Sequence, residues 1–190
     1  MIGHWKSIPG HFNFSDLYMK AVEHADEGAV FVELGVWKGR SAAFMIETIM
    51  NSGKYIKFYC VDTWNPPLHA GPGLLEDEDV VNDRLYESFL NYMKPYEGHY
   101  HPIISDATDA ALFFEDDSVD FIFVDADHET EAVKSDILAW TPKMKSHGVI
   151  TGHDIKGQEV QSALTDLKLE WKWYGENSFY IVNPNGFITW

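Results

Sequence analysis

The sequence reads AVFVELGVWKGRSAAF between Ala29 and Phe44, and its pattern changes there from apolar to glycine-rich to helical. The apolar run ends in Glu33, and Gly35 and Gly39 then bracket a tight turn. Gly35 lets the backbone approach a ligand where a side chain would block it, and the free N–H groups of a helix that begins after Gly39 point at such a ligand. A strand, a glycine turn and a helix in this order predict a nucleotide-binding cradle, with an ordinary strand-to-helix connection as the alternative.

A second predicted strand, residues 55–61, follows the helix and ends in Asp62. The separation of Glu33 and Asp62 along the chain suits one βαβ unit whose second strand carries an acid at its carboxyl end. In nucleotide-binding units of this kind, that acid lies where a ribose binds. The downstream sequence therefore extends the cradle into a predicted half-site for a nucleoside.

Strand and helix patterns alternate along the rest of the chain, and a short turn joins the last two strands. Alternation predicts a parallel sheet with helices on both faces, whereas a four-residue connection can only join antiparallel neighbours. The predicted fold is therefore α/β, a Rossmann-like doubly wound sheet of seven strands, mostly parallel, with an antiparallel C-terminal hairpin strand. We predict strands at 29–34, 55–61, 100–105, 119–127, 149–151, 171–174 and 179–182, and helices at 15–28, 39–50, 80–93, 106–114, 128–140 and 158–167.

Residues 1–190 are predicted to form a single domain, because the chain can bury a full core and contains no linker. Residues 1–28 are predicted to be an N-terminal arm followed by a helix with Ser15 as its N-cap. Prolines and glycines after Asp62 argue against regular structure in the long connection, and residues 65–79 are predicted to be a lid. The acidic run EDED at 76–79 is predicted to be a solvated loop, with metal binding as the alternative.

The chain carries 14 basic and 30 acidic residues, which gives a net charge of −16. Such a surface repels phosphate backbones, and no local basic patch is present, so the sequence predicts no nucleic-acid partner. The single cysteine, Cys60, excludes an internal disulfide and agrees with a reducing compartment. Because no apolar run approaches the length of a membrane span, we predict a cytoplasmic protein with no membrane partner.

Acidic residues follow five successive predicted strands, at Glu33, Asp62, Asp106, Asp125 and Asp154. Ligands of open parallel sheets bind outside the carboxyl ends of the strands, so these acids would gather on one rim. Acids favour helix N-termini, and capping accounts for two or three of them. A cation-bearing ligand or a metal ion would relieve the repulsion among the rest.

Four segments together resemble the class I S-adenosylmethionine-dependent methyltransferases. In chain order they are VELGVWKGRSA, CVDTW, VDFIFVDADHETEAVKSDILAW and GVITGHD. The resemblance is narrowest to small-molecule O-methyltransferases of the methyltransferase 24 type, which include the macrocin and related sugar methyltransferases and are distantly similar to catechol O-methyltransferase. Its most specific part is the pair VDADH and GHD, since glycine turns occur in many nucleotide-binding folds.

The resemblance implies that the strand exits bind S-adenosylmethionine. It places Glu33, Gly35 and Gly39 around the amino acid part of the cofactor. Asp62 would accept the two ribose hydroxyls, which a carboxylate can do. With the adenine end and two further positions included, the implied cofactor-binding residues are Glu33, Gly35, Gly39, Ser41, Asp62, Thr63, Trp64, Asp106, Ala107 and Asp125.

At the adenine end, the resemblance places Asp106 and Ala107 beside the ring. Thr63 and Trp64 would cover its face. Packing within the loop is the alternative for Trp64.

Relatives that use a divalent ion bind it at the end of the fourth strand and at two adjacent positions at the end of the fifth. Here these positions are Asp125, His153 and Asp154. Asp125 and Asp154 are oxygen ligands suited to Mg²⁺, which would orient the acceptor hydroxyl and lower its pKa. The imidazole of His153 departs from the usual oxygen donor, so it either shifts the preference toward a softer metal or is no ligand.

Two residues are candidates for the base that takes the proton of the acceptor hydroxyl. His128 opens a predicted helix that points at the site, and a histidine there has its protonated form disfavoured, which suits a base. Asp127 occupies a position that serves as the base in some similar enzymes. We favour His128, with helix capping as its alternative role.

The resemblance implies methyl transfer to a hydroxyl of a small molecule, a sugar or a phenol. Because this transfer requires alignment and the exclusion of water, Trp5, His11 and Phe12 of the arm are predicted to help the 65–79 loop cover the site. A nicotinamide-dependent oxidoreductase is one alternative, although the full G-x-G-x-x-G is absent. A cofactor-binding module without catalysis is another. Related enzymes often associate, so a homo-oligomer is compatible with the resemblance.

Overall fold

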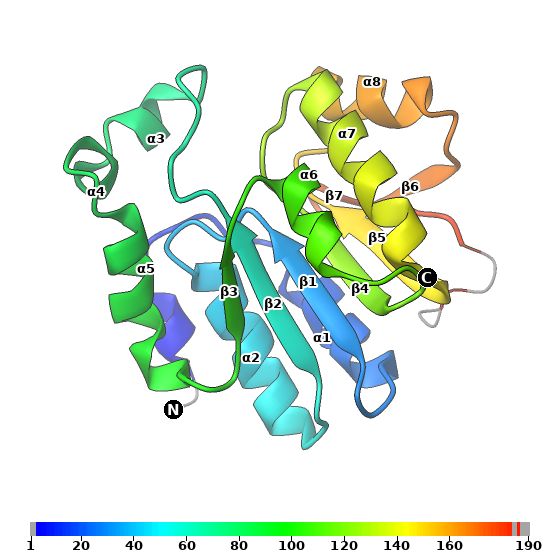
Figure 1. Cartoon of the computed structure of the whole chain (residues 1–190), viewed down its shortest axis with the longest axis horizontal. Helices are drawn as coiled ribbons and strands as arrows, with labels where there is room; N and C mark the ends of the chain where they lie inside the picture. Colours follow the sequence, from blue (N-terminus) through cyan, green and yellow to red (C-terminus); the bar gives the residue numbers. More distant parts are fainter. Residues whose placement is uncertain (1–2, 184–185, 187–190) are drawn as a thin grey trace.

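The computed structural model describes residues 3–183 and residue 186. These residues form a seven-stranded sheet in the order β3-β2-β1-β4-β5-β7-β6 (Figure 1). All pairings are parallel except those of β7, which is antiparallel to both neighbours. The predicted fold class is confirmed. The strands are β1 Val30–Leu34, β2 Lys57–Asp62, β3 His101–Ile104, β4 Val119–Val124, β5 Met144–Gly152, β6 Trp171–Tyr174 and β7 Ser178–Ile181.

Side chains of the central strands alternate between two apolar layers, as the period of two in a strand requires. Phe31 of β1 and Phe121 of β4 belong to the layer that also contains the buried faces of α1 Ser15–His24, α2 Arg40–Ser52 and α5 Leu85–Met93. Their neighbours Val32 and Ile122 belong to the opposite layer, with Trp140. The central strands β1 and β4 are therefore covered on both faces.

The second layer is built by α6 Ala107–Ala110 and α7 Thr130–Trp140, which lie in front of the sheet in Figure 1. The helix α8 Gln158–Asp166 packs beside α7 and against Phe179 of β7. Short 3₁₀ helices precede or extend the main elements at η1 His4–Ser7, η2 Lys94–Tyr96, η3 Ala111–Phe113 and η4 Thr141–Lys143.

Several element boundaries differ from the predictions. The helix α1 ends at His24 instead of residue 28, and Ser15 is its first residue and not its cap, because Phe14 occupies the cap position. The predicted helix 80–93 is broken, since Asp83 adopts a left-handed φ of 54° between α4 Glu78–Val81 and α5. In contrast to the prediction, β4 ends at Val124 and β5 begins at Met144.

The connection after β2 was wrongly predicted to lack regular structure. It contains the helical turn α3 Pro72–Leu75 and the start of α4. Pro72 occupies the first turn of α3, where its missing N–H group has no helical partner to lose.

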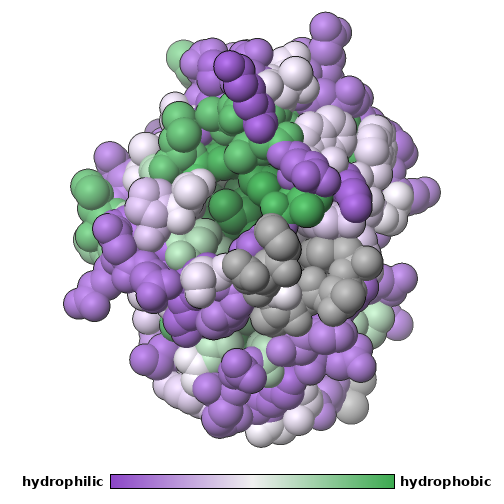
Figure 2. Space-filling view, turned by 90° about the vertical axis from the view of Figure 1, so that its right-hand side faces the viewer, coloured by the Kyte–Doolittle hydropathy of each residue, from purple (hydrophilic) through white to green (hydrophobic). Residues whose placement is uncertain are grey.

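Figure 2 shows the side that carries α8 and the β6–β7 hairpin, where hydrophilic residues dominate and surround an apolar area. Among the helices of residues 3–183, none combines the length and the apolar character that crossing a membrane would require.

Candidate active site

A cavity of ≈ 1160 Å³ lies at the carboxyl ends of the parallel strands. Part of the 65–79 segment and the arm residues Pro9, Gly10 and His11 also line it. Trp5 and Phe12, predicted to cover the site, pack instead on Phe44 of α2. The predicted site residues that line the cavity are Gly35, Ser41, Asp62, Thr63, Asp106, Ala107, Asp125, Asp127, His128, His153 and Asp154.

Gly35 is required where the exits of β1 and β4 meet. Its φ is 85°, and a Cβ there would overlap the carbonyl oxygen of Asp125. The N–H of Asp125 donates to Leu34 across the same contact (2.9 Å). Only glycine permits this approach, so the turn leaves its backbone bare on the cavity wall.

Gly39 has a different role from the predicted one. It adopts a φ of 91° as the cap of α2, but it does not line the cavity. A Cβ there would lie 2.7 Å from Sδ of Met93 and 3.1 Å from the ring of Phe89. Gly39 therefore allows α2 to pack against α5 and does not face a ligand.

The carboxylate of Asp62 holds the glycine turn in place. Oδ2 accepts the backbone N–H groups of Val36 and Trp37 (2.8 Å each), and Oδ1 accepts that of Trp64 (2.7 Å). Burial raises the pKa of Asp62, and these hydrogen bonds oppose the rise. The same carboxylate also lines the cavity.

Glu33 lies beneath the cavity wall and does not line it. Its side chain is 1% exposed and accepts a hydrogen bond from the hydroxyl of Ser41, which does line the cavity. Burial raises the pKa of Glu33 to about 8, and the hydrogen bond from Ser41 opposes the rise. Burial therefore favours the neutral form of Glu33, and its hydrogen-bond partner Ser41, not Glu33 itself, lines the cavity.

Trp64 is part of the core, which agrees with loop packing and not with a role over the adenine. Its indole packs on Tyr86 and Phe89, with ring centroids 4.7 Å away in each case. The indole N–H donates to the carbonyl of Trp37 (2.9 Å). Trp64 does not line the cavity, whereas Thr63 beside it does.

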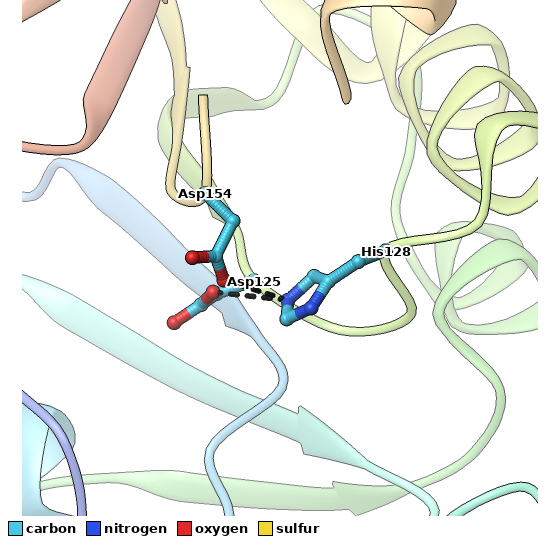
Figure 3. Close-up of side chains that lie close together, drawn as sticks. All are labelled: Asp125, His128 and Asp154. Atoms are coloured by element: carbon cyan, nitrogen blue, oxygen red, sulfur yellow. Dashed lines mark ion pairs between the residues drawn. The ribbon is translucent and has the colours of Figure 1, made fainter. Parts of the chain in front are cut away.

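Asp125, His128 and Asp154 come together at the exits of β4 and β5 (Figure 3). Nε2 of His128 is 3.4 Å from Oδ1 of Asp125 and 3.2 Å from Oδ2 of Asp154. One ligand atom from each residue lies within 4.8 Å of the others, which is a spacing that a divalent cation could bridge. The donor set of two carboxylates and one imidazole fits such an ion.

His153, the third predicted metal ligand, lies beside this cluster. Its Nδ1 is 3.4 Å from Oδ2 of Asp154 and 3.7 Å from Oδ1 of Asp125, and its Nε2 contacts Oδ1 of Asn13 (2.9 Å). The ring is 5% exposed and packs against Phe14 of the arm. The arm thereby fixes the orientation of His153 next to the carboxylates.

The electrostatics of the cluster follow from its packing. The hydrogen bond from His153, together with His128, lowers the pKa of Asp154 to about 2, although burial opposes the shift. Burial raises the pKa of Asp125, which His128 and His153 oppose. The hydrogen bond to Asp125 raises the pKa of His128.

The predicted electrostatic setting of His128 is therefore wrong. The helix α7 begins at Thr130 with Glu129 as its cap, so His128 lies in the preceding loop. The adjacent carboxylates favour its protonated form, in contrast to the expected effect of a helix N-terminus. His128 lies within ion-pair distance of both Asp125 and Asp154.

Asp127, the other candidate base, is engaged by two groups. Oδ1 accepts the N–H of Glu129 (3.0 Å), and Nε2 of His69 lies 3.0 Å from Oδ2. His69 belongs to the 65–79 segment and lines the cavity. This contact joins the segment to the exit of β4.

Comparison with known proteins places this geometry in a family. Residues 32–155 match the family described as "Methyltransferase domain". The chain belongs to this family. Together with the strand order, this membership identifies the fold of class I S-adenosylmethionine-dependent methyltransferases and argues against the nicotinamide-dependent alternative.

One curated relative and several solved structures are similar to this chain. Over 136 residues the chain is 27% identical to the uncharacterized protein y4gI of Sinorhizobium fredii, covering 72% of this chain but 14% of that protein. The O-methyltransferase NovP has a TM-score of 0.63 at 13% identity, over 88% of this chain and 78% of that chain. The S-adenosylhomocysteine-bound methyltransferase PaMTH1 of Podospora anserina has a TM-score of 0.63 at 12% identity, over 95% and 86%.

A further similar structure is a putative caffeoyl-CoA O-methyltransferase from Staphylococcus aureus. Its TM-score is 0.59 at 13% identity, over 93% of this chain and 86% of that chain. At such identities, these structures show a shared fold.

Sequence reasoning missed three contacts around the cavity. The first is His69 with Asp127, and the second joins Nζ of Lys38 to Asp77 (2.7 Å) and to Asp79 (2.7 Å). The side chain of Lys38 is 7% exposed, so two acids of the EDED run pair with a buried lysine, which the predicted solvated loop did not include. The third joins the buried Asp136 of α7, which lines the cavity, to the hydroxyl of Thr108 (3.0 Å). No local pattern marks these partners, because each contact joins residues that are distant in sequence.

Proposed function

We propose that this chain transfers the methyl group of S-adenosylmethionine to a hydroxyl of a small molecule. The observation that carries the proposal is that one cavity is lined both by the Gly35 turn and by the Asp125–His128–Asp154 cluster. Ligand pockets commonly measure about 300–1,000 Å³, so ≈ 1160 Å³ accommodates a cofactor together with an acceptor. Family membership supports the cofactor, and the cluster supports hydroxyl chemistry.

In this proposal the cofactor extends from the Gly35 turn to Asp106. The bare backbone at Gly35 receives its amino acid part, Asp62 its ribose, and the start of α6 its adenine. Methyl transfer needs alignment of the hydroxyl with the methyl group and exclusion of water, and it needs no covalent intermediate on the protein. The cavity walls supplied by Pro9, Gly10, His11 and the 65–79 segment would provide that exclusion.

We further propose that Asp125 and Asp154 hold a divalent cation, which would supply Lewis-acid activation of the hydroxyl. The imidazole of His128 next to them favours Mn²⁺ or Zn²⁺ more than an all-oxygen set would, while the carboxylates remain suited to Mg²⁺. Where its imidazole is not itself a ligand of the ion, His128 is the favoured acceptor of the hydroxyl proton, because a cation held by the two carboxylates would offset the charges that favour its protonated form. Asp127 already accepts from Glu129 and contacts His69. A small uncharged sugar or phenol is the proposed class of acceptor.

Calorimetry with S-adenosylhomocysteine, followed by titration with Mg²⁺ and Mn²⁺, tests these proposals in order. We expect S-adenosylhomocysteine to bind the wild-type chain, and we expect one divalent ion to bind that complex. Asp125→Asn should lose the ion but keep S-adenosylhomocysteine. His128→Gln separates the roles of the imidazole: loss of ion binding makes it a ligand, whereas retained ion binding leaves it as the base. Absence of S-adenosylhomocysteine binding to the wild type would refute the proposed activity.

A further inference from the structure

Asp136 of α7 is a buried carboxyl group at the part of the cavity formed by α6 and α7. Its exposed fraction is 4%, and it lines the cavity together with Asp106, Ala107 and Thr108. Oδ1 of Asp136 accepts a hydrogen bond from the hydroxyl of Thr108 (3.0 Å). The backbone N–H of Thr108 donates in turn to Oδ1 of Asp106 (2.9 Å). Asp136 is therefore fixed in the wall at the strand exit that leads into α6.

The indole of Trp140, one helical turn further along α7, reinforces this wall. Its N–H donates to the carbonyl oxygen of Ala107 (2.8 Å), and its ring is fully buried. Two side chains of α7 thus hold the start of α6 at a fixed distance. The carboxyl group of Asp136 consequently has little freedom to turn away from the cavity or to find another partner.

The ionisable groups that face Asp136 are all acidic. Asp106 at the start of α6 and Asp127 at the exit of β4 both act on it, and His69 pairs with Asp127. No lysine, arginine or histidine forms an ion pair with Asp136 within residues 3–183. Burial first, and then these two carboxylates, raise the pKa of Asp136 to about 7, against the hydrogen bond from Thr108.

The two protonation states of Asp136 offer different hydrogen-bonding groups to a ligand. A carboxylate only accepts, whereas a protonated carboxyl group has one O–H donor and still accepts. One edge of adenine presents a donor, the N6 amino group, next to an acceptor, N7. The neutral acid is complementary to that edge, because it can donate to the ring nitrogen and accept from the amino group.

We propose that Asp136 is a specificity-determining residue, and that its neutral carboxyl group recognises the adenine of the cofactor. The proposal rests on the proposed function, since it places adenine at the start of α6. Recognition of this kind requires that binding above neutral pH be accompanied by proton uptake. The site then rejects a purine that carries an oxygen in place of the amino group, because two acceptors would face each other.

The direction of the pH dependence follows from linkage. Below a pKa of about 7 the free protein already carries the proton on Asp136, so cofactor binding there takes up none. Above it, each pH unit weakens binding by up to about tenfold, until the pKa of the complex is reached. Affinity should therefore be flat at acidic pH and fall above neutrality.

Titration calorimetry of the full chain with S-adenosylhomocysteine at pH 6 and pH 8, in phosphate and in Tris, measures both affinity and proton uptake. For the wild type we expect no uptake at pH 6, uptake approaching one proton at pH 8, and about tenfold weaker binding at pH 8. S-inosylhomocysteine should bind at least about tenfold more weakly than S-adenosylhomocysteine at pH 6.

Variants assign the proton to this residue. Asp136→Asn keeps a donor and an acceptor, so it should retain the affinity at pH 6 and lose both the uptake and the pH dependence. Asp136→Leu should bind at least about tenfold more weakly at both pH values. Asp166→Asn, on the exposed side of α8, is the matched control and should behave as the wild type.

The outcomes separate this inference from the activity on which it rests. If the wild type binds S-adenosylhomocysteine without proton uptake, or if Asp136→Asn keeps the pH dependence of the wild type, the inference is refuted while the proposed function stands. If the wild type does not bind at all, the proposed function fails. Should Asp136→Leu not fold, as circular dichroism would reveal, the comparison of wild type and Asp136→Asn decides alone.

Discussion

The two sides of the cavity use their charged groups in opposite ways. On the β1–β2 side, Asp62 accepts three backbone N–H groups, and Lys38 is paired with Asp77 and Asp79. On the β4–β5 side, Asp125 accepts no backbone hydrogen bond within the described residues, and its partners are His128 and His153. The first side uses its charges to hold its own chain, whereas the second leaves them facing one another.

This difference separates scaffold from reactive groups. Buried carboxylates that accept backbone N–H groups stabilise a turn, and their removal leaves donors without partners. The side-chain partners of Asp125 are titratable groups that a ligand or an ion can replace, and Asp154 adds to such partners one hydrogen bond from the side-chain amide of Asn177 (2.8 Å). The glycine turn is therefore expected to be the rigid half of the site, and the Asp125–Asp154 half the one that changes its partners on binding.

The largest expected effect comes from adding a methyl group to the rigid half. Gly35→Ala forces a Cβ onto the carbonyl oxygen of Asp125 at a φ of 85°, so we expect a loss of more than about 4 kcal/mol and no binding of S-adenosylhomocysteine. Gly53→Ala is the control, since its φ is 73° but nothing lies within 4 Å of the added carbon. It should lose only about 1–2 kcal/mol, the cost of the left-handed conformation. Thermal unfolding and calorimetry measure both, and equal losses would show that the contact with Asp125 is not decisive.

A matched pair of charge removals tests the comparison directly. Asp62→Asn replaces one acceptor with a donor that faces backbone N–H groups, and we expect it to lose about 2 kcal/mol of stability, or about 4–8 °C in the melting temperature. Asp125→Asn removes a carboxyl group whose pKa is raised by burial, which means that the protein already disfavours its charged form. The metal-free melting temperature should therefore stay level or rise, while ion binding is lost. If Asp125→Asn destabilises the chain as much as Asp62→Asn does, both halves are scaffold and the distinction fails.

The parts of this architecture that could be predicted from sequence are those that local pattern determines. The apolar runs predicted the strands β1 and β4, and the acids at the carboxyl ends of β2, β3, β4 and β5 identified Asp62, Asp106, Asp125 and Asp154 as wall residues of one cavity. This succeeded because parallel strands end at the same edge of a sheet, so position along each strand predicts position in space.

The residues that sequence reasoning missed or misplaced depend on contacts between distant segments. Gly39 fits a nucleotide turn by its spacing, yet its neighbour is Met93 of α5. Lys38 and His69 have partners 39 and 58 residues away along the chain. The helix and strand periods of the sequence do not predict pairs at such separations. The helix α7 begins at Thr130, two residues later than predicted, so His128 is not at its N-terminus. The electrostatic environment of His128 is instead determined by the carboxylates of Asp125 and Asp154.

The smallest expected effect concerns Trp64, for which the sequence left two roles open. Trp64→Phe keeps a ring against Tyr86 and Phe89 but removes the N–H that donates to Trp37, so we expect a loss of about 1 kcal/mol in unfolding free energy. The affinity for S-adenosylhomocysteine should stay within about twofold of the wild type, because the indole does not line the cavity. Urea denaturation and calorimetry give the two numbers. A tenfold weaker affinity with little change in stability would instead place Trp64 over the adenine. Trp64 would then belong, like Thr63, to the ligand-binding wall and not to the scaffold.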